Sequence, residues 1–170
     1  MALITEDGTG MSDTESYCTV AFADAYHAAH GVTSWAALDT TAKEQRLRLA
    51  TEYMVQAYRL QWAGWRSTAA QALDWPRAYV PRRDVGDYYA SDIVPLEVQR
   101  ACAELANRVV PGQLLLADQG REVLEQTVGP ITTRYAQGTS QATRYAGVDA
   151  LLGPLLLAER GGSTMRLVRA

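Results

Sequence analysis

Lysine is almost absent from this chain: fifteen of its sixteen basic residues are arginine, and Lys43 is the exception. Arginine favours fixed, forked and partly buried pairing over the loosely solvated charge that lysine provides. The scarcity of lysine therefore favours contacts with protein partners, although arginine also binds phosphate.

Cysteine is scarce as well. Cys18 and Cys102 lie in apolar contexts without a CxxC spacing. We therefore expect neither a disulfide framework nor a zinc site. We expect two reduced thiols in the core.

Long apolar runs are also missing. No run approaches the roughly 18 residues that a membrane span needs, and no basic region precedes an apolar one at the N-terminus. We therefore expect a soluble, unprocessed chain. Its 170 residues suit a single domain.

The motifs of common catalytic sites are absent. The chain has no GxxxxGK[ST] motif, no GxGxxG opening a helix and no Gx[ST]xG nucleophile elbow. Asp24, His27 and His30 could reach one metal from one helix face, but no fourth ligand is visible and polar groups suit a helix C-terminus anyway. Asp84 and Asp87 lack calcium-loop spacing and are typical of a turn. We expect no enzymatic activity, no cofactor and no metal.

Hydrophobic periodicity predicts a mainly α fold: a small bundle of three main helices, a long aromatic loop, a short β-hairpin and an extended C-terminal tail. We expect an extended N-terminal arm at 1–16, one helical domain at 17–157 and a mobile tail at 158–170. The arm is polar and glycine-rich, so we expect that only a partner surface could hold it in place. The predicted elements are helices at about 20–30, 41–60 and 92–109, and a hairpin at 121–135.

The second helix has the clearest start signal. Thr41 and Glu44 have the spacing of a capping box, in which each side chain bonds the backbone N–H of the other residue. Glu44 also lies one turn before Arg48, which is the spacing of a helical ion pair.

Half of the aromatic residues lie between positions 58 and 89, a stretch that indicates neither helix nor strand. Such a long loop is usually functional or disordered, and disorder is depleted in aromatics, so we expect packing to order it. Aromatic plus arginine is the composition of protein interface hot spots and of single-strand nucleic-acid grooves. The aromatic residues are Tyr58, Trp62, Trp65, Trp75, Tyr79, Tyr88 and Tyr89, and the arginines are Arg59, Arg66, Arg77, Arg82 and Arg83.

The sequence Leu73-Asp-Trp-Pro-Arg77 predicts a stiff kink, because proline forces the preceding residue into an extended conformation. Two interpretations stay open. In the first, the kink splays Trp75 and Arg77 toward a partner. In the second, Trp75 closes the helix bundle while Asp74 and Arg77 form a local ion pair. The two are compatible, since a rigid core anchor can also present a loop to a neighbour.

Charge changes sign along the chain. Residues 1–42 hold six acidic and no basic residues, residues 43–83 hold eight basic and three acidic residues, and residues 84–170 total −2. An acidic arm followed by a basic segment can neutralise itself within one chain. It can also reach from one subunit to the next.

Four motifs occur in order: Leu3-Ile-Thr-Glu-Asp-Gly-Thr-Gly10 followed by Ser16-Tyr17, the Tyr26-His27 helix ending at Gly31, the Leu-Asp-Trp-Pro-Arg77 kink, and Val94-Pro95 opening a helix. Together they resemble head-to-tail adaptor proteins of tailed bacteriophages, sequences that are also described as DnaT-like single-stranded DNA-binding proteins. The resemblance runs from residue 3 to about residue 157. The kink and the N-terminal arm are its most specific parts.

The resemblance implies a structural virion protein. Its mainly helical subunits would form a dodecameric ring under the portal vertex, extend the DNA channel and attach neck or tail components. The implied partners are copies of the chain, the portal protein and a tail or neck protein, with genomic double-stranded DNA close by and no membrane. The implied location is the capsid–tail junction, assembled in the host cytoplasm.

A ring requires heterologous contacts, and three groups of residues are assigned to contacts in this reading. The acidic arm residues Glu6, Asp7 and Asp13 are expected to meet the basic 43–83 region of another subunit. Contacts between subunits or with a tail-side partner are assigned to Trp62, Trp65, Arg66, Trp75, Pro76, Arg77, Tyr79, Arg82 and Arg83. Portal docking is assigned to the C-terminal residues Leu155, Leu156, Leu157, Arg160, Arg166, Leu167 and Arg169.

The alternative is a single-stranded DNA-binding protein of replication. The aromatic and arginine loop supports it, because stacking contributes roughly 1 to 3 kcal/mol per base. A pI of about 5.4 and an acidic arm weaken it, because they give a poor electrostatic footprint for nucleic acid.

Overall fold

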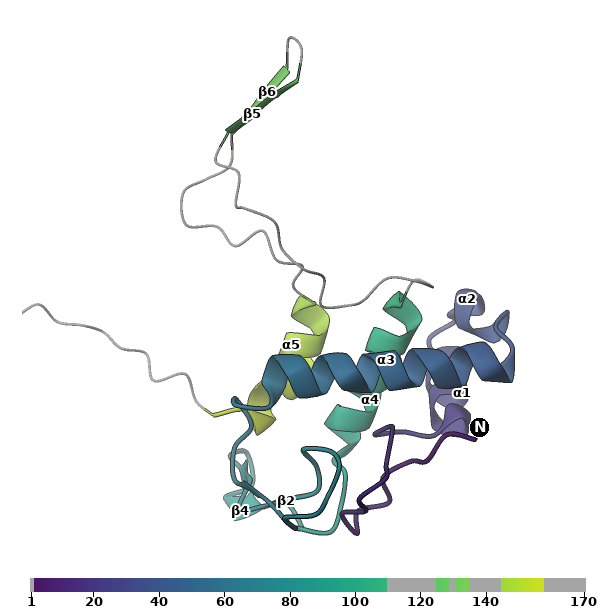
Figure 1. The fold of residues 1–170 in the computed structure, drawn as a ribbon. Helices are drawn as coiled ribbons and strands as arrows, with labels where there is room; N and C mark the ends of the chain where they lie inside the picture. Colours follow the sequence, from purple (N-terminus) through teal and green to yellow (C-terminus); the bar gives the residue numbers. More distant parts are fainter. Residues whose placement is uncertain (1, 110–124, 129–130, 135–144, 158–170) are drawn as a thin grey trace, which may run out of the picture.

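The computed structural model describes residues 2–109, 125–128, 131–134 and 145–157. The long helix α3 lies across α4 and α5, while α1 and α2 pack near one end of it and irregular chain fills the side below (Figure 1). The helices are α1 (Val20–Ala29), α2 (Thr33–Ala36), α3 (Thr40–Tyr58), α4 (Leu96–Arg108), α5 (Ala146–Leu152) and the 3-10 turn η1 (Gly153–Leu155). The strands are β1 (Trp65–Arg66), β2 (Arg77–Ala78), β3 (Pro81–Arg82), β4 (Asp87–Tyr88), β5 (Glu125–Val128) and β6 (Ile131–Arg134).

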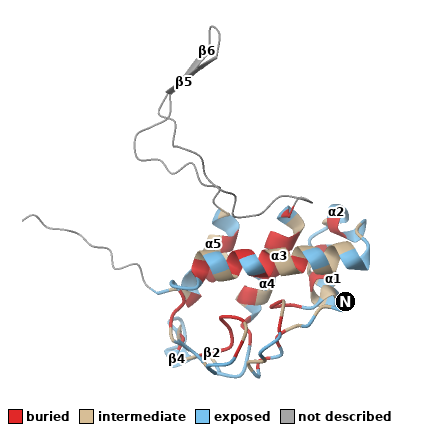
Figure 2. Cartoon of the chain, in the orientation of Figure 1, coloured by how far each residue is buried: buried red, intermediate tan, exposed pale blue. Residues whose placement is uncertain are grey.

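The core lies where α3, α4 and α5 meet, and buried residues follow the facing sides of these helices (Figure 2). On α3, Leu47, Ala50 and Met54 are fully buried. On α4, five fully buried side chains form one apolar stripe: Val98, Ala101, Cys102, Leu105 and Ala106.

Both cysteines are free and buried, as expected. The Cys102 sulfur lies 3.4 Å from the Thr51 hydroxyl oxygen. A hydrogen bond with Cys102, together with burial, raises the pKa of the Cys18 thiol. Cys18 is therefore a protonated core side chain rather than a reactive thiolate.

The mainly helical fold is confirmed, but the start of α3 differs from the expectation. The helix begins at Thr40, and the Asp39 side chain caps it by accepting a hydrogen bond from the Ala42 N–H at 2.7 Å. The predicted Thr41–Glu44 capping box is wrong, because the cap lies two residues earlier. Glu44 instead lies 3.8 Å from Arg48, so the predicted ion pair one turn apart is confirmed.

Residues 2–16 are held by their own chain, contrary to the expectation that only a partner could order them. Thr5 bridges Ser16 in parallel, and the Ala72 N–H donates to the Met11 carbonyl at 2.9 Å. Gly8, at φ 106°, passes so close to the Asp92 carbonyl that no Cβ would fit between them. The arm therefore covers the irregular side of the helical body.

The aromatic loop contains two short hairpins that its sequence did not indicate. β1 pairs with β2 and β3 pairs with β4, both antiparallel. Each strand has only two residues, too short for alternating polarity to be visible in the sequence. The predicted hairpin at 121–135 is confirmed as β5 and β6, which pair from Glu125 with Arg134 to Val128 with Ile131.

The last described segment returns to the body. Leu156 forms an antiparallel bridge with Trp62, and the Leu157 N–H donates to the Gln61 carbonyl at 2.7 Å. The predicted C-terminal tail at 158–170 lies outside the described residues. Within the described parts of the chain, every helix is too short or too polar to cross a membrane.

Candidate nucleic-acid interface

Six of the seven aromatic residues of the 58–89 stretch fall into two groups, and the seventh, Tyr89, is partly buried. Tyr58, Trp62 and Trp75 are buried, with Trp75 fully so, whereas Trp65, Tyr79 and Tyr88 have 74%, 71% and 59% of their surface exposed. The sequence placed both groups in one loop without separating them. The buried group supports the loop, and the exposed group is available for contact.

The buried tryptophans anchor the loop on the helical body. The Trp62 and Trp75 rings meet edge to face with centroids 5.7 Å apart, and Trp62 also lies 5.8 Å from the Tyr58 ring at the end of α3. The peptide bond between Trp75 and Pro76 is cis. Trp75 therefore closes the helix bundle, as one of the two open interpretations proposed.

Arg77 is buried and organises the backbone of the loop. Its guanidinium donates to the carbonyls of Ala63 at 2.8 Å, Gly64 at 2.8 Å and Asp74 at 3.2 Å. Burial lowers its pKa, against the attraction of the Asp74 charge. The predicted Asp74–Arg77 ion pair is wrong, because Arg77 bonds the Asp74 backbone while the Asp74 carboxylate accepts from Arg59 at 3.0 Å.

Gln71 is a structural residue of the loop that the sequence did not single out. Its side-chain nitrogen donates to the carbonyls of Leu73 and Pro76, at 2.9 and 3.1 Å, and its oxygen accepts from the Thr68 N–H at 2.9 Å. A single glutamine in a loop gives no sequence signal for such a role.

The exposed rings lie on and beside the two short hairpins. Trp65 is paired with Ala78, the neighbour of Tyr79. Tyr79 adopts φ 60°, a left-handed conformation that is unusual for a bulky residue. Its ring meets the Tyr88 ring edge to face at 6.3 Å. Strand pairing thus fixes the backbone at Trp65, and the Tyr79 and Tyr88 rings support each other while all three residues stay exposed.

Three exposed arginines accompany these rings. Arg66 follows Trp65 on β1 and donates to the Gln71 carbonyl. Arg82 lies 5.4 Å from the centre of the Tyr89 ring, and Arg83 donates to the Leu156 carbonyl at 3.3 Å. We call the following set the aromatic–arginine surface: Trp65, Arg66, Tyr79, Arg82, Arg83 and Tyr88.

The residues assigned to a subunit or tail-side interface are therefore split by burial. Trp65, Arg66, Tyr79, Arg82 and Arg83 are exposed. The remaining four are buried and act as supports rather than contacts: Trp62, Trp75, Pro76 and Arg77.

The residues assigned to portal docking are split as well. Leu155 is fully buried in its own chain, so it is not available for docking, while Leu157 is 57% exposed. Leu156 is partly buried beside Trp62. The other assigned residues, Arg160, Arg166, Leu167 and Arg169, lie outside the described residues.

The acidic arm is partly used within the chain. Glu6 is buried, and its carboxylate accepts hydrogen bonds from the Gly8 and Gly10 N–H groups at 3.0 and 2.9 Å. Glu6 therefore shapes its own arm and does not fit the expected contact with another subunit. Asp7 and Asp13 are exposed, and their contact with a neighbour stays a prediction.

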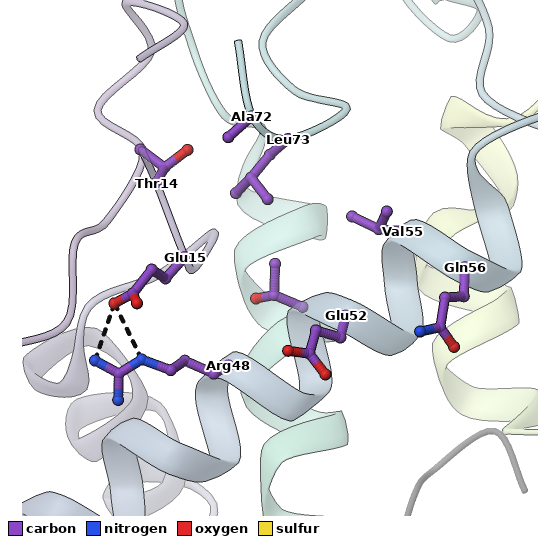
Figure 3. Close-up of a pocket in the computed structure, with 9 residues that line it drawn as sticks. Thr14, Glu15, Arg48, Glu52, Val55, Gln56, Ala72 and Leu73 are labelled. Carbon is purple, nitrogen blue, oxygen red and sulfur yellow. Dashed lines mark hydrogen bonds and ion pairs between the residues drawn. The ribbon is translucent and has the colours of Figure 1, made fainter. Parts of the chain in front are cut away.

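Two further acidic residues near the N-terminus pair with the basic segment of the same chain. Glu15 accepts from the Arg48 guanidinium at 2.9 and 3.0 Å (Figure 3). Asp24 lies 2.9 Å from Lys43. Part of the charge split is therefore neutralised within one chain, which was one of the two possibilities.

The Glu15–Arg48 pair forms one wall of a pocket of about 320 Å³ between the N-terminal arm, α3 and the segment before the kink (Figure 3). Val55, Ala72 and Leu73 also line it. The mixture of apolar and charged walls does not specify one ligand.

The side chains of Asp24, His27 and His30 do not converge. Asp24 accepts from the Trp35 indole at 2.7 Å, His27 contacts the Ala103 carbonyl at 3.0 Å, and His30 contacts the Tyr26 carbonyl at 2.7 Å. Among the residues whose structure is described, no group of three or more His, Cys, Asp or Glu side chains could hold a metal ion.

A comparison with protein-family models matches residues 1–170, the full chain, to the family described as "putative DnaT-like ssDNA binding protein". The chain belongs to this family. A search of curated proteins and a search of solved structures each returned no match. The family match does not support the resemblance to head-to-tail adaptors, so an adaptor role for this DnaT-like chain stays a proposal.

Proposed function

We propose that the chain binds single-stranded DNA through the aromatic–arginine surface. One observation carries this proposal: Trp65, Tyr79 and Tyr88 expose their rings beside three exposed arginines, on a loop anchored by buried tryptophans. The family description names the same class of ligand.

Exposed rings on a fixed backbone suit unpaired bases. Each base has an apolar face that can stack on an aromatic ring whatever its sequence, at about 1 to 3 kcal/mol per base. The bases of a duplex are already stacked on each other, so this surface should discriminate single strands from duplex DNA. Strand pairing fixes the backbone of Trp65 and Tyr88, and the Tyr79 and Tyr88 rings contact each other, so less freedom is lost on binding than from an unstructured loop.

The arginines supply the attraction to phosphate. The whole chain carries a net charge of −3. The acidic residue Asp84 lies in the turn that joins β3 to β4, and Asp87 is the first residue of β4. The attraction is therefore local and weaker than in a basic protein. We expect measurable binding at low salt and a steep loss of affinity as salt rises.

Fluorescence anisotropy with a labelled 20-nucleotide oligo-dT tests the proposal. The affinity should exceed that for a duplex of equal length, and Tyr88→Ala should lower it about five- to tenfold through the loss of a stacking contact. Leu60→Ala is the matched control, because Leu60 is 90% exposed and carries no aromatic ring. Equal loss in both variants, or no binding by the native chain, would refute the proposal.

The second candidate is the structural head-to-tail adaptor, and two exposed apolar residues favour it. Leu60 and Leu157 are 90% and 57% exposed, and the Leu157 N–H donates to the carbonyl of Gln61, the chain neighbour of Leu60. Exposed leucines suit a protein contact better than a nucleic-acid contact. Leu157 is also one of the residues assigned to portal docking.

In this second proposal, twelve copies ring the DNA channel, the C-terminal residues dock on the portal, and the other side of the ring receives a neck or tail protein. Co-sedimentation with portal rings tests it. The native chain should sediment with the portal, and a chain with Leu60→Ser and Leu157→Ser should not. A native chain that stays in the supernatant would remove this candidate.

A further inference from the structure

We propose that the pocket beneath Trp65 is a phosphate-binding subsite for a nucleic-acid strand. This inference rests on the proposed single-stranded DNA function and assigns one phosphate of the strand to a defined place. The pocket has a volume of about 420 Å³ and is lined by side chains from the end of α3, from β1 and from the kink, among them Arg59, Trp65, Arg66, Asp74 and Arg77.

The charge of the pocket suits an anion. Three guanidinium groups face a single carboxylate, which gives a local excess of positive charge in a chain that is acidic as a whole. This excess of positive charge disfavours a cation in the pocket. A phosphate diester carries one negative charge and accepts the forked hydrogen bonds that arginine donates.

The arginines differ in how many donors they have left. Arg77 is already occupied by the loop, because all three of its nitrogen groups donate hydrogen bonds to backbone carbonyls. Arg59 uses only its Nε, in the bond to Asp74, and Arg66 uses only one Nη group, in the bond to the Gln71 carbonyl. Within the described parts of the chain, the remaining N–H groups of Arg59 and Arg66 have no acceptor.

Both arginines are also held by their existing bonds. One nitrogen of each is tied to the loop, and the side chain of Arg59 is still 48% exposed. A phosphate that enters the pocket therefore meets guanidinium groups whose positions are already fixed, which lowers the entropy cost of the contact.

The position of Trp65 links the pocket to a base. Its indole is 74% exposed and also lines the hollow. A strand that stacks a base on this ring brings its phosphate to the arginines beneath it. Arg59 and Arg66 thus become phosphate-positioning residues, and Trp65 becomes the stacking platform of the same nucleotide.

Salt titrations of oligo-dT binding test the subsite with Arg59→Gln, Arg66→Gln and the control Arg100→Gln, which removes an exposed arginine of α4. Each pocket variant should lower affinity about tenfold, the loss of a hydrogen bond to a charged group. Each should also reduce the slope of log affinity against log salt by about 0.7, one phosphate contact on a single strand. Arg100→Gln should change neither quantity.

Arg66→Gln is the decisive variant, because Arg59→Gln also removes the partner of Asp74 and can loosen the loop. A second measurement needs no oligonucleotide: the arginine Nε–H signals of the native chain are followed by NMR during titration with thymidine 5′-monophosphate. The Arg66 signal, identified by its absence in Arg66→Gln, should shift, and the Arg100 signal should not.

The outcomes separate the two proposals. If the native chain binds oligo-dT and Arg66→Gln keeps both its affinity and its salt slope, the subsite is wrong while the single-strand function stands. If the native chain does not bind oligo-dT but the Arg66 signal shifts with the nucleotide, the function fails and the phosphate site stands. An unshifted Arg66 signal together with no oligonucleotide binding overturns both.

Discussion

The Arg59 guanidinium covers the carboxylate of Asp74, with its Nε donating to Oδ1 at 3.0 Å. Asp74 is 1% exposed, whereas the side chain of Arg59 keeps 48% of its surface in solvent. This pair ties the end of α3 to the residue before Trp75. It therefore couples the helical body to the loop that carries the aromatic–arginine surface.

Arg59→Gln should destabilise the fold, because it leaves the Asp74 carboxylate buried without its ionic partner. We expect the free energy of unfolding to fall by about 1 to 3 kcal/mol, measured by urea denaturation. Arg100→Gln, on an exposed face of α4, should change it by less than about 0.5 kcal/mol. If the two variants had equal stability, the pair would not anchor the loop.

Gly8→Ala should loosen the N-terminal arm. Gly8 has φ 106° and a Cβ there would collide with the Asp92 carbonyl, so the arm must move away. Gly86→Ala is the control, because Gly86 also has a positive φ, 75°, but open space around it. In urea denaturation, Gly86→Ala should lower the free energy of unfolding only by its conformational strain, about 1 to 2 kcal/mol, and Gly8→Ala should lower it by more. Gly8→Ala should also make residues 2–16 accessible to protease.

Stability should fall as the pH drops from about 7 toward 5, because of His27. Burial lowers the pKa of His27 below its ordinary value of 6.5, against the nearby charges of Glu104 and Asp24. Its Nε2 donates to the Ala103 carbonyl, and its buried Nδ1 has no hydrogen-bond partner among the residues that the structure describes. A proton added at Nδ1 would have no partner, so the folded state resists it.

The sign follows from this depressed pKa. The unfolded chain takes up a proton as the pH falls through 6.5 while the folded chain does not, so protonation favours unfolding. His27→Gln keeps a donor for the Ala103 carbonyl and should flatten the curve of unfolding free energy between pH 7 and 5. An unchanged slope in this variant would assign the pH dependence to other groups.

The sequence was sufficient for the three main helices, α1, α3 and α4, because their signals are local, but it did not predict α2 or α5. The apolar stripe of α4 and the Glu44–Arg48 spacing of α3 both depend on residues three or four apart. The predicted capping box was also wrong for a local reason. Asp39 lies two residues before Thr41, and its side chain accepts the hydrogen bond from the Ala42 N–H that caps the helix.

Contacts between distant segments could not be read from the sequence. The arm is ordered by Thr68, Ala72 and Asp92, all more than fifty residues away along the chain. Glu6 resembled a free acidic residue because its partners, the N–H groups of Gly8 and Gly10, depend on the turn that the arm adopts.

The sequence predicted which residues share the aromatic loop but not which of them are buried. Composition placed aromatic and arginine residues together, yet it could not separate the buried Trp62 and Trp75 from the exposed Trp65. Whether a tryptophan is buried depends on which rings pack against the helical body. For the same reason, Arg77 resembled a contact residue although backbone carbonyls occupy its donors.

The fluorescence of Trp65 gives the most direct test of the single-strand proposal. Of the four tryptophans, Trp65 is 74% exposed, whereas Trp35, Trp62 and Trp75 are at most 2% exposed, so quenching by acrylamide reports mainly on Trp65. Saturating oligo-dT should protect this signal from acrylamide in the native chain, and Trp65→Phe should abolish the quenchable signal itself. If acrylamide quenched the native chain equally with and without oligo-dT, under conditions where anisotropy shows the strand bound, the aromatic–arginine surface would not be the binding site.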